Sequence, residues 1–146
     1  MENTGVLKAG KILQRVVLNI SQIMINRYAE VSGDFNPVHV DVEGAANSEF
    51  GGTIAHGCIP LEPLFQGLSE ALRRPDLPLE TQISVRYRKP SRPGDRIHLE
   101  ARVLETGSDG NVKIAFSCVN QNEQAVLEGE CLVPTENVRC EQKEPT

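Results

Sequence analysis

Hydrophobic and polar positions follow two different periods along this chain. Between residues 61 and 72, apolar residues recur three and four positions apart, at Leu61, Leu64, Phe65, Leu68 and Leu72. That spacing places them on one face of a helix. From residue 83 onward the period changes to two, with apolar side chains at Ile83, Val85, Tyr87, Ile97, Leu99, Ala101, Val103, Val112, Ile114, Phe116 and Cys118. The second half therefore predicts strands, which we expect to form an antiparallel meander that ends in "AVLEGECLVP".

The first half begins with signals for a short strand and then a helix. The stretch "VLKAGKILQRVVLNI" contains a β-branched run that is typical of an opening strand. "SQIMINRYAEVSGD" then predicts a helix, with Ser21 as its N-cap and Gly33 as its stop. Ile20 and Ile25 stand at the two positions of a hydrophobic staple around that N-cap.

A second short helix is expected to begin at Asp41 as its N-cap and to run to the Gly51-Gly52 pair. Residues 32–41, "SGDFNPVHVD", would then form a loop between two helices.

The longest predicted helix follows Gly57 and extends to Arg73 and Arg74, whose cations suit the negative end of a helix dipole. Pro75, just beyond, stops it from continuing. Pro60 and Pro63 complicate its start, because proline is tolerated only in the first turn. Either the helix begins near Pro63 or its first turn is kinked.

These elements predict a single α+β domain. A core helix and a long curved antiparallel sheet each need the other's apolar face, so we expect the sheet to wrap around the central helix. A chain of 146 residues is long enough for one core and too short for two good ones. We expect the domain to cover residues 1–134 and a polar tail to cover residues 135–146.

Charge and composition exclude several classes of partner. The net charge of -5 opposes attraction to nucleic acid or to anionic lipid. No apolar stretch approaches the ~20 residues that span a bilayer. The amino terminus also lacks the charged-then-apolar layout of a signal peptide. We therefore expect a cytoplasmic protein without nucleic-acid or membrane partners.

The cysteines are expected to be reduced thiols, at Cys58, Cys118, Cys131 and Cys140. They show no CxxC pair and no Cys/His ligand spacing, and a chain of this size does not depend on disulfides. Cys58 alone lies close to the polar loop, but nothing near it in the sequence is clearly placed to activate it as a nucleophile.

The loop "SGDFNPVHVD" admits two interpretations. Asp, Asn, Gly and Pro are common turn formers, so its composition alone predicts a turn. However, Asp34 and His39 are five residues apart with Pro37 between them, so the loop can bend back and aim both side chains at one water molecule. The spacing therefore also predicts an acid-base pair.

A second segment, "GGTIAHGCIP", places a His-Gly pair at the start of the central helix. Gly57 lets a substrate approach the backbone closely. Free N–H groups at a helix N-terminus favour developing negative charge. An acid-base pair and an oxyanion donor would together make a reaction site.

Taken together, "YAEVSGDFNPVHVD" and "FGGTIAHG" resemble the hydratase motif of MaoC-like, (R)-specific enoyl-CoA hydratases, a family with the hot-dog fold. The resemblance implies reversible addition of water to a trans-2-enoyl thioester, which gives an (R)-3-hydroxyacyl thioester. It implies that Asp34 and His39 hold the water and that Gly57 donates its backbone N–H to the thioester carbonyl. Asn36 either orients Asp34 or the water, or stabilises the turn before Pro37. The resemblance requires no metal or cofactor, and it implies a homodimer or higher homo-oligomer.

Further candidates for contact with the thioester are Phe35, Phe50, His56, Cys58, Gln66, Arg86 and Arg88. For the phenylalanines, a place in the core or in a pocket wall is favoured over specific contact with a ligand. For His56, packing or a bond to the backbone is favoured over chemistry. Guanidinium groups bind the phosphates of coenzyme A or of a carrier protein's pantetheine arm. Charged residues that alternate along a strand, however, commonly just face solvent.

The chain departs from the family pattern at the start of the central helix. It carries one extra residue there, together with Pro60, Glu62 and Pro63, and Gln66 stands near the place of a small hydroxyl residue. These departures leave acyl-chain length open. They also keep two alternatives, a hot-dog thioesterase and a non-catalytic subunit that binds acyl thioesters.

Overall fold

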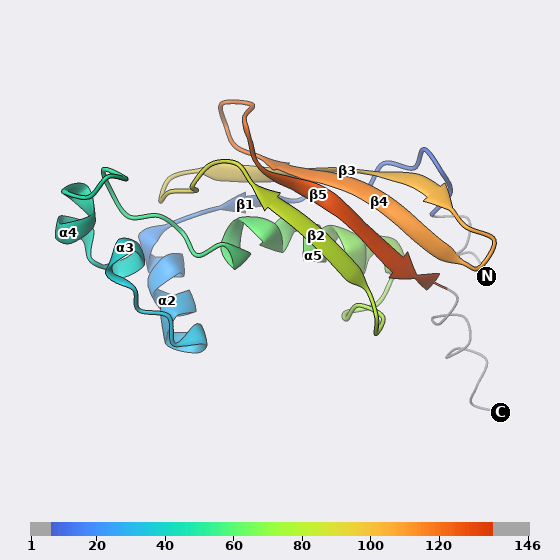
Figure 1. The fold of residues 1–146 in the computed structure, drawn as a ribbon, viewed down its shortest axis with the longest axis horizontal. Helices are drawn as coiled ribbons and strands as arrows, with labels where there is room; N and C mark the ends of the chain where they lie inside the picture. The colour runs from blue at the N-terminus through green and yellow to red at the C-terminus, as the bar shows by residue number, and fades with distance from the viewer. Residues whose placement is uncertain (1–6, 136–146) are drawn as a thin grey trace.

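The fold is an antiparallel sheet laid over one long helix, with three shorter helices beyond one end of the sheet (Figure 1). This computed structural model describes residues 7–135, so the predicted tail, apart from its first residue, lies outside the described part. The elements are β1 (Val17–Asn19), α2 (Gln22–Ser32), α3 (Pro37–Val40), α4 (Val42–Ala46), α5 (Cys58–Leu72), β2 (Gln82–Tyr87), β3 (Arg96–Thr106), β4 (Asn111–Val119) and β5 (Ala125–Pro134). Within residues 7–135, no helix is long and apolar enough to cross a membrane.

The sheet has the order β1-β3-β4-β5-β2, so the predicted meander is correct only for β3, β4 and β5. The strand β2 pairs with β5 and forms the opposite edge from β1. Residues 88–95, between β2 and β3, contain Pro90 and Pro93, which cannot donate to a sheet ladder. This link instead pairs with the segment that leads into α5, where the Ala55 N–H donates to the Ser91 carbonyl at 2.7 Å. The prediction failed at β2 because strand pairing over this distance leaves no local signal.

The core lies between α5 and the sheet. Leu64 and Leu68 of α5 are fully buried, as are Leu99 and Ile114 on the facing strands. Full burial of one such side chain is worth ~1.5–3 kcal/mol. Helix and sheet approach closely at Gly67, where an added Cβ would lie 2.4 Å from a methyl carbon of Leu99. The apolar residues that predicted one helix face and one sheet face are therefore the ones that pack between the two layers.

The central helix begins at Cys58, with Pro63 inside it, so a start near Pro63 is wrong. Because Pro63 has no N–H, the first turns of α5 lack one backbone bond. The helix ends at Leu72, and Arg73 forms the C-cap in the left-handed conformation (φ 59°), where its N–H donates to the Ser69 carbonyl. The predicted end was therefore within two residues.

The caps of α2 agree with the sequence prediction. The Ser21 hydroxyl accepts a hydrogen bond from the Met24 N–H at 3.1 Å, and Gly33 is the C-cap with φ 83°. Both staple residues, Ile20 and Ile25, are buried. This helix therefore presents its carboxyl end firmly to the loop that follows.

The second short helix is shorter than predicted. Asp41 caps α4 by accepting from the Gly44 N–H at 3.0 Å, but the helix ends at Ala46 rather than at the Gly51-Gly52 pair. The Ala45 carbonyl accepts from the Ser48 hydroxyl and, at 3.0 Å, from the Ser48 N–H. This tighter i→i+3 turn takes the place of the bond that would continue the α-helix.

Candidate active site

The predicted loop contains a small helix that the sequence analysis missed. Asn36 caps α3 by accepting a hydrogen bond from the Val38 N–H at 3.1 Å, and Pro37 occupies the first helical position. The side-chain oxygen of Asn36 is therefore used in the turn. Its backbone N–H donates to Oδ1 of Asp34 at 3.2 Å, so Asn36 orients that carboxylate through its main chain.

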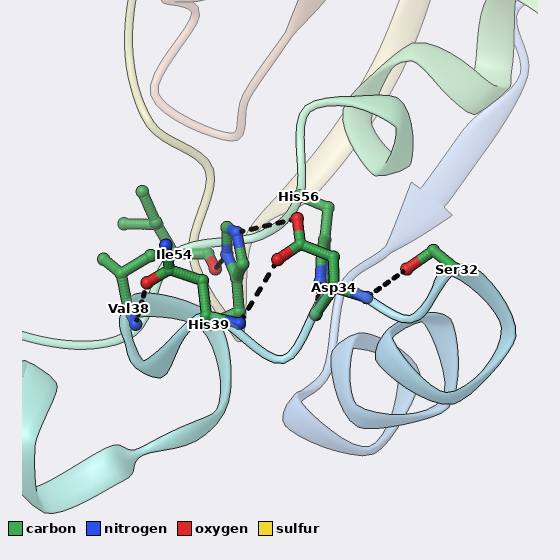
Figure 2. Close-up of polar contacts among 7 residues, drawn as sticks. Ser32, Asp34, Val38, His39, Ile54 and His56 are labelled. Carbon is green, nitrogen blue, oxygen red and sulfur yellow. Dashed lines mark hydrogen bonds and ion pairs between the residues drawn. The ribbon is translucent and has the colours of Figure 1, made fainter.

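Asp34 and His39 converge as their spacing predicted (Figure 2). Nε2 of His39 lies 3.7 Å from Oδ2 of Asp34. Nδ1 of the same ring lies 2.8 Å from the Ile54 carbonyl oxygen. Because a carbonyl can only accept, Nδ1 carries a proton, and the neutral ring presents an unprotonated Nε2 to Asp34. At 3.7 Å the two atoms are too far apart for a direct hydrogen bond, but one water at ~2.8 Å can reach both.

His56 contacts both Asp34 and His39. Its Nε2 donates to the Asp34 carbonyl at 3.0 Å, and its ring stacks on His39 with centroids 3.9 Å apart and planes at 25°. The ring also contacts Tyr28, with centroids 4.7 Å apart. His56 is only 4% exposed, and its Nδ1 is buried without a hydrogen-bond partner within residues 7–135. This histidine therefore fixes both the Asp34 backbone and the plane of the His39 ring.

A second brace comes from α2. The Gln22 side chain donates to the His39 carbonyl at 2.8 Å and accepts from the Thr53 hydroxyl at 2.7 Å. The Ile54 N–H in turn donates to the Val38 carbonyl at 3.0 Å. The helix that carries His39 is thus tied to α2 and to the segment that precedes α5.

Gly57 stands at the start of α5, one residue after His56. The helix begins with no side-chain cap, and within residues 7–135 the Gly57 N–H donates to no protein acceptor. Gly57 is exposed. The N-terminus of this 15-residue helix therefore offers a free donor beside the acid-base pair, where negative charge is favoured.

Two tyrosines, Tyr28 and Tyr87, belong to this site and were missed by the sequence analysis. The Tyr87 hydroxyl donates to the Gly57 carbonyl at 2.8 Å. A hydrogen bond with Cys58 raises the pKa of Tyr28, and partial burial and the nearby Asp34 act in the same direction. Partial burial, and then the nearby Cys58, raise the pKa of Tyr87. Both hydroxyls therefore stay protonated at neutral pH. Tyr28 opens the motif "YAEVSGD", but nothing in the sequence linked Tyr87 to Gly57.

The aromatic and thiol candidates differ in exposure and in their contacts. Cys58 is exposed and lies close enough to Tyr28 to raise the pKa of its hydroxyl. Phe35, next to Asp34, is 56% exposed. Phe50 is half-buried, and its carbonyl accepts a hydrogen bond from the Arg92 guanidinium. Phe35 and Cys58 are thus on the surface and open to a ligand.

Three other candidates lie elsewhere. Gln66 is exposed and lines a hollow beside β1 with residues 14–17. Because Tyr87 points toward Gly57, the alternation of β2 directs Arg86 to the other face of the sheet. There Arg86 lines a hollow with Glu128 and Glu130, and the Arg88 guanidinium forms an ion pair with Glu128. The structure does not bring these three residues to the acid-base pair.

The cluster of Asp34, His39 and His56 also has the dimensions of a metal site, since one ligand atom from each lies within 4.8 Å of the others. The two imidazoles, however, are stacked nearly parallel and each spends one nitrogen on a backbone carbonyl. Lone pairs in such parallel planes do not converge on one ion. The arrangement suits a water held by Asp34 and His39 better than a cation.

The expected thiol state is seen for three of the four cysteines. Cys58, Cys118 and Cys131 are free, and Cys140 lies outside the described residues. Burial raises the pKa of both Cys118 and Cys131 to about 12. These two thiols therefore belong to the core and take no part in chemistry.

Comparison with known proteins gives a consistent family. The MaoC-like domain family matches residues 7–124. The mitochondrial 3-hydroxyacyl-[acyl-carrier-protein] dehydratase of Arabidopsis thaliana is 33% identical over 144 residues, covering 96% of this chain and 84% of that protein. The 3-hydroxybutyryl-CoA dehydratase of Methylorubrum extorquens is 31% identical over 115 residues, covering 78% and 72% of the two chains.

Solved structures confirm the expected hot-dog architecture. The R-hydratase PhaJ1 of Pseudomonas aeruginosa superposes with a TM-score of 0.75 at 29% identity, covering 90% of this chain and 83% of that one. The (R)-hydratase of A. caviae, involved in PHA biosynthesis, also gives a TM-score of 0.75, at 25% identity, covering 87% and 96%.

Proposed function

Because this chain belongs to the MaoC-like domain family, we propose that its hydratase or dehydratase activity is reversible addition of water to a trans-2-enoyl thioester, giving an (R)-3-hydroxyacyl thioester. The names of its relatives, a 3-hydroxyacyl dehydratase and two (R)-hydratases, support this reaction class. The observation that carries the proposal is the 3.7 Å approach of the His39 Nε2 to the Asp34 carboxylate. A free helix N-terminus begins one residue after the histidine that braces both.

In the hydration direction, Asp34 and His39 hold the attacking water. The unprotonated Nε2 of His39 takes one proton while the water oxygen forms its bond to the β-carbon of the enoyl group. The electron pair of the double bond moves through the α-carbon onto the thioester carbonyl. The resulting imidazolium then gives its proton to the α-carbon, so that one water has been added. Dehydration follows the same steps in reverse.

Gly57 supplies the other half of the mechanism. Negative charge develops on the thioester oxygen, and the free N–H of Gly57 can donate a hydrogen bond to that oxygen. Loss of one comparable oxyanion donor costs ~3 kcal/mol in other enzymes. General acid-base help from the Asp34 and His39 pair adds ~10²- to 10⁴-fold. The scheme uses only side chains and backbone groups of this chain.

We further propose a homodimer built along β2. This edge strand pairs only with β5 among residues 7–135, so the groups on its other side remain open to another strand. Leu79, just before β2, is 80% exposed, and Tyr87 at its end is half-exposed. A second copy added here would extend the sheet and cover the exposed rim of the site. Light scattering of the purified protein tests this, and a monomer at micromolar concentration would overturn it. A cytoplasmic location stays a prediction.

The enzymatic proposal is tested by the absorbance of crotonyl-CoA after enzyme is added. We expect the conjugated signal to be lost with the wild type and retained with Asp34→Asn or His39→Ala. Asp76→Asn, the same chemical change on an exposed loop, is the matched control and should behave as wild type. Full activity in either site variant would defeat the assignment.

The alternatives give different signals in the same assay. Release of free thiol with the double bond intact would indicate a thioesterase. Saturable binding of the thioester without turnover would indicate a non-catalytic binding subunit. The acyl-chain length that gives the highest kcat/KM then defines the substrate.

A further inference from the structure

Tyr87 joins the end of the edge strand to Gly57, the N-cap of the central helix. Its hydroxyl donates to the Gly57 carbonyl at 2.8 Å, across 30 residues of sequence. The backbone of Tyr87 is itself held, because Tyr87 pairs with Leu127 of β5 and the next N–H, that of Arg88, donates to Val126 at 2.8 Å. The phenol therefore reaches Gly57 from a fixed strand.

The glycine and the tyrosine fit each other. Gly57 has φ -58° and ψ -30°, which is ordinary helical backbone that any residue adopts. Conformation therefore does not explain why a glycine stands there. An added Cβ would lie 3.1 Å from the Tyr87 hydroxyl oxygen and 3.2 Å from the ring carbon that carries it. The phenol occupies the space that a side chain at residue 57 would need.

The start of α5 depends on this contact for an anchor. No side chain caps the helix, and both Pro60 and Pro63 lack the N–H that would tighten its first turns. On the upstream side the segment is held by the Ala55 bond to Ser91 and by the His56 bond to Asp34. On the downstream side of Gly57, the Tyr87 hydroxyl is the side-chain contact that fixes the carbonyl.

We propose that Tyr87 is a positioning residue that holds Gly57 so that its N–H points at the thioester oxygen. Glycine restrains its own φ and ψ less than any other residue does, so without this contact the N–H of Gly57 would vary more in direction. The proton of the Tyr87 hydroxyl is already committed to the Gly57 carbonyl, so it acts through Gly57 rather than on the substrate. A phenol holds its proton at neutral pH, and burial, which raises the pKa of Tyr87, acts in the same direction.

This inference rests on the proposed function, and Tyr87→Phe tests it. The variant keeps the ring against Gly57 and removes one oxygen from a half-exposed side chain, so the fold is retained. We expect kcat to fall by about tenfold with KM nearly unchanged, because the lost alignment matters in the transition state. We also expect faster hydrogen exchange at the Ile59 amide, which donates to the His56 carbonyl at 3.0 Å across Gly57, measured without substrate.

The outcomes separate the two claims. Wild-type kcat in Tyr87→Phe, with an active wild-type enzyme, would overturn the positioning role and leave the proposed function standing. A rise in KM with constant kcat would overturn it as well, because it would show a ground-state contact. An inactive wild type would defeat the proposed function itself. Exchange at the Ile59 amide that is as slow in the variant as in the wild type would overturn the positioning role by an independent measurement.

Discussion

His39 faces Asp34 with its unprotonated nitrogen, at 3.7 Å, because the opposite nitrogen of its ring donates to the Ile54 carbonyl at 2.8 Å. The other neutral tautomer would place a protonated Nε2 toward the carboxylate and leave the Ile54 carbonyl without its donor. The segment that carries Ile54 therefore selects the tautomer in which His39 can accept a proton. The backbone carbonyl of Ile54, which takes no part in the reaction, thus sets the protonation of the His39 ring.

The brace that His56 provides can be separated from its packing. In His56→Phe the ring stack on His39 is kept while the donor to the Asp34 carbonyl is lost. We expect kcat/KM to fall by about tenfold and the free energy of unfolding to fall by ~1 kcal/mol, the net worth of one hydrogen bond. His56→Leu, which loses both contacts, should lose more activity. Steady-state kinetics and urea unfolding measure these effects, and full activity in His56→Phe would show that the bond does not hold Asp34.

The pairing of β2 with β5 depends on Gly129. An added Cβ there would lie 1.8 Å from the Ser84 carbonyl oxygen, so Gly129→Ala must push the two strands apart. We expect a loss of about 3 kcal/mol in the free energy of unfolding, as for other overpacked sites. Gly52→Ala, whose Cβ would meet only the far end of Arg92 at 3.4 Å, is the matched control and should stay within ~0.5 kcal/mol. Chemical denaturation compares the two, and equal midpoints would contradict the close approach.

The thiols should differ sharply in reactivity. Cys58 is exposed, whereas Cys118 and Cys131 are buried and their pKa values are raised to about 12. In a Cys140→Ser background, Ellman's reagent at pH 8 should titrate one thiol in the folded protein and three after denaturation. Rapid modification of more than one thiol in the folded state would contradict the described core.

Alkaline pH should weaken the fold through the same two buried thiols. An unfolded cysteine ionises near its ordinary pKa of 9.0, while the folded chain retains both protons up to about pH 12. The folded state thus binds more protons in this interval, so the free energy of unfolding falls as pH rises from about 9 toward about 12. Urea unfolding at pH 8.5 and pH 10 measures the decrease. Cys131→Ala should show a smaller decrease than the wild type, and an equal slope in both proteins would count against the assignment.

The role of Arg86 and Arg88 in phosphate binding stays a prediction. Replacing both by Ala should raise KM for an acyl-CoA by about threefold to tenfold if they contact phosphate, as expected for exposed charge pairs of ~1 kcal/mol. Glu128→Gln releases Arg88 from its ion pair and should lower KM. Unchanged KM in both variants would show that Arg86 and Arg88 do not bind phosphate.

Local signals explain what the sequence predicted well. Ser21, Gly33 and Asp41 act on backbone groups within a few residues of themselves, so their caps were found from spacing alone. The approach of Asp34 and His39 is also local, because Pro37 and the Asn36 cap bend five residues into one turn.

Contacts between distant segments had no such signal. The place of β2 beside β5, the bond from His56 to the Asp34 backbone and the bond from Tyr87 to Gly57 each join residues at least 22 positions apart. Alternation showed that Tyr87 belongs to a strand, but it did not show what its hydroxyl would meet. The four-residue helix α3 was missed because its length is too short for any periodic pattern.

The bond from Ala55 to Ser91 couples the link that follows β2 to the segment that carries His56 and Gly57. A subunit docked on β2 and a thioester seated at Gly57 would both further restrain the stretch between them. The conformational entropy of that stretch is lost at whichever binding event comes first. The second event then loses less, so subunit association and substrate binding each strengthen the other. Association would then tighten with substrate concentration, and dilution would weaken catalysis before it unfolds the chain.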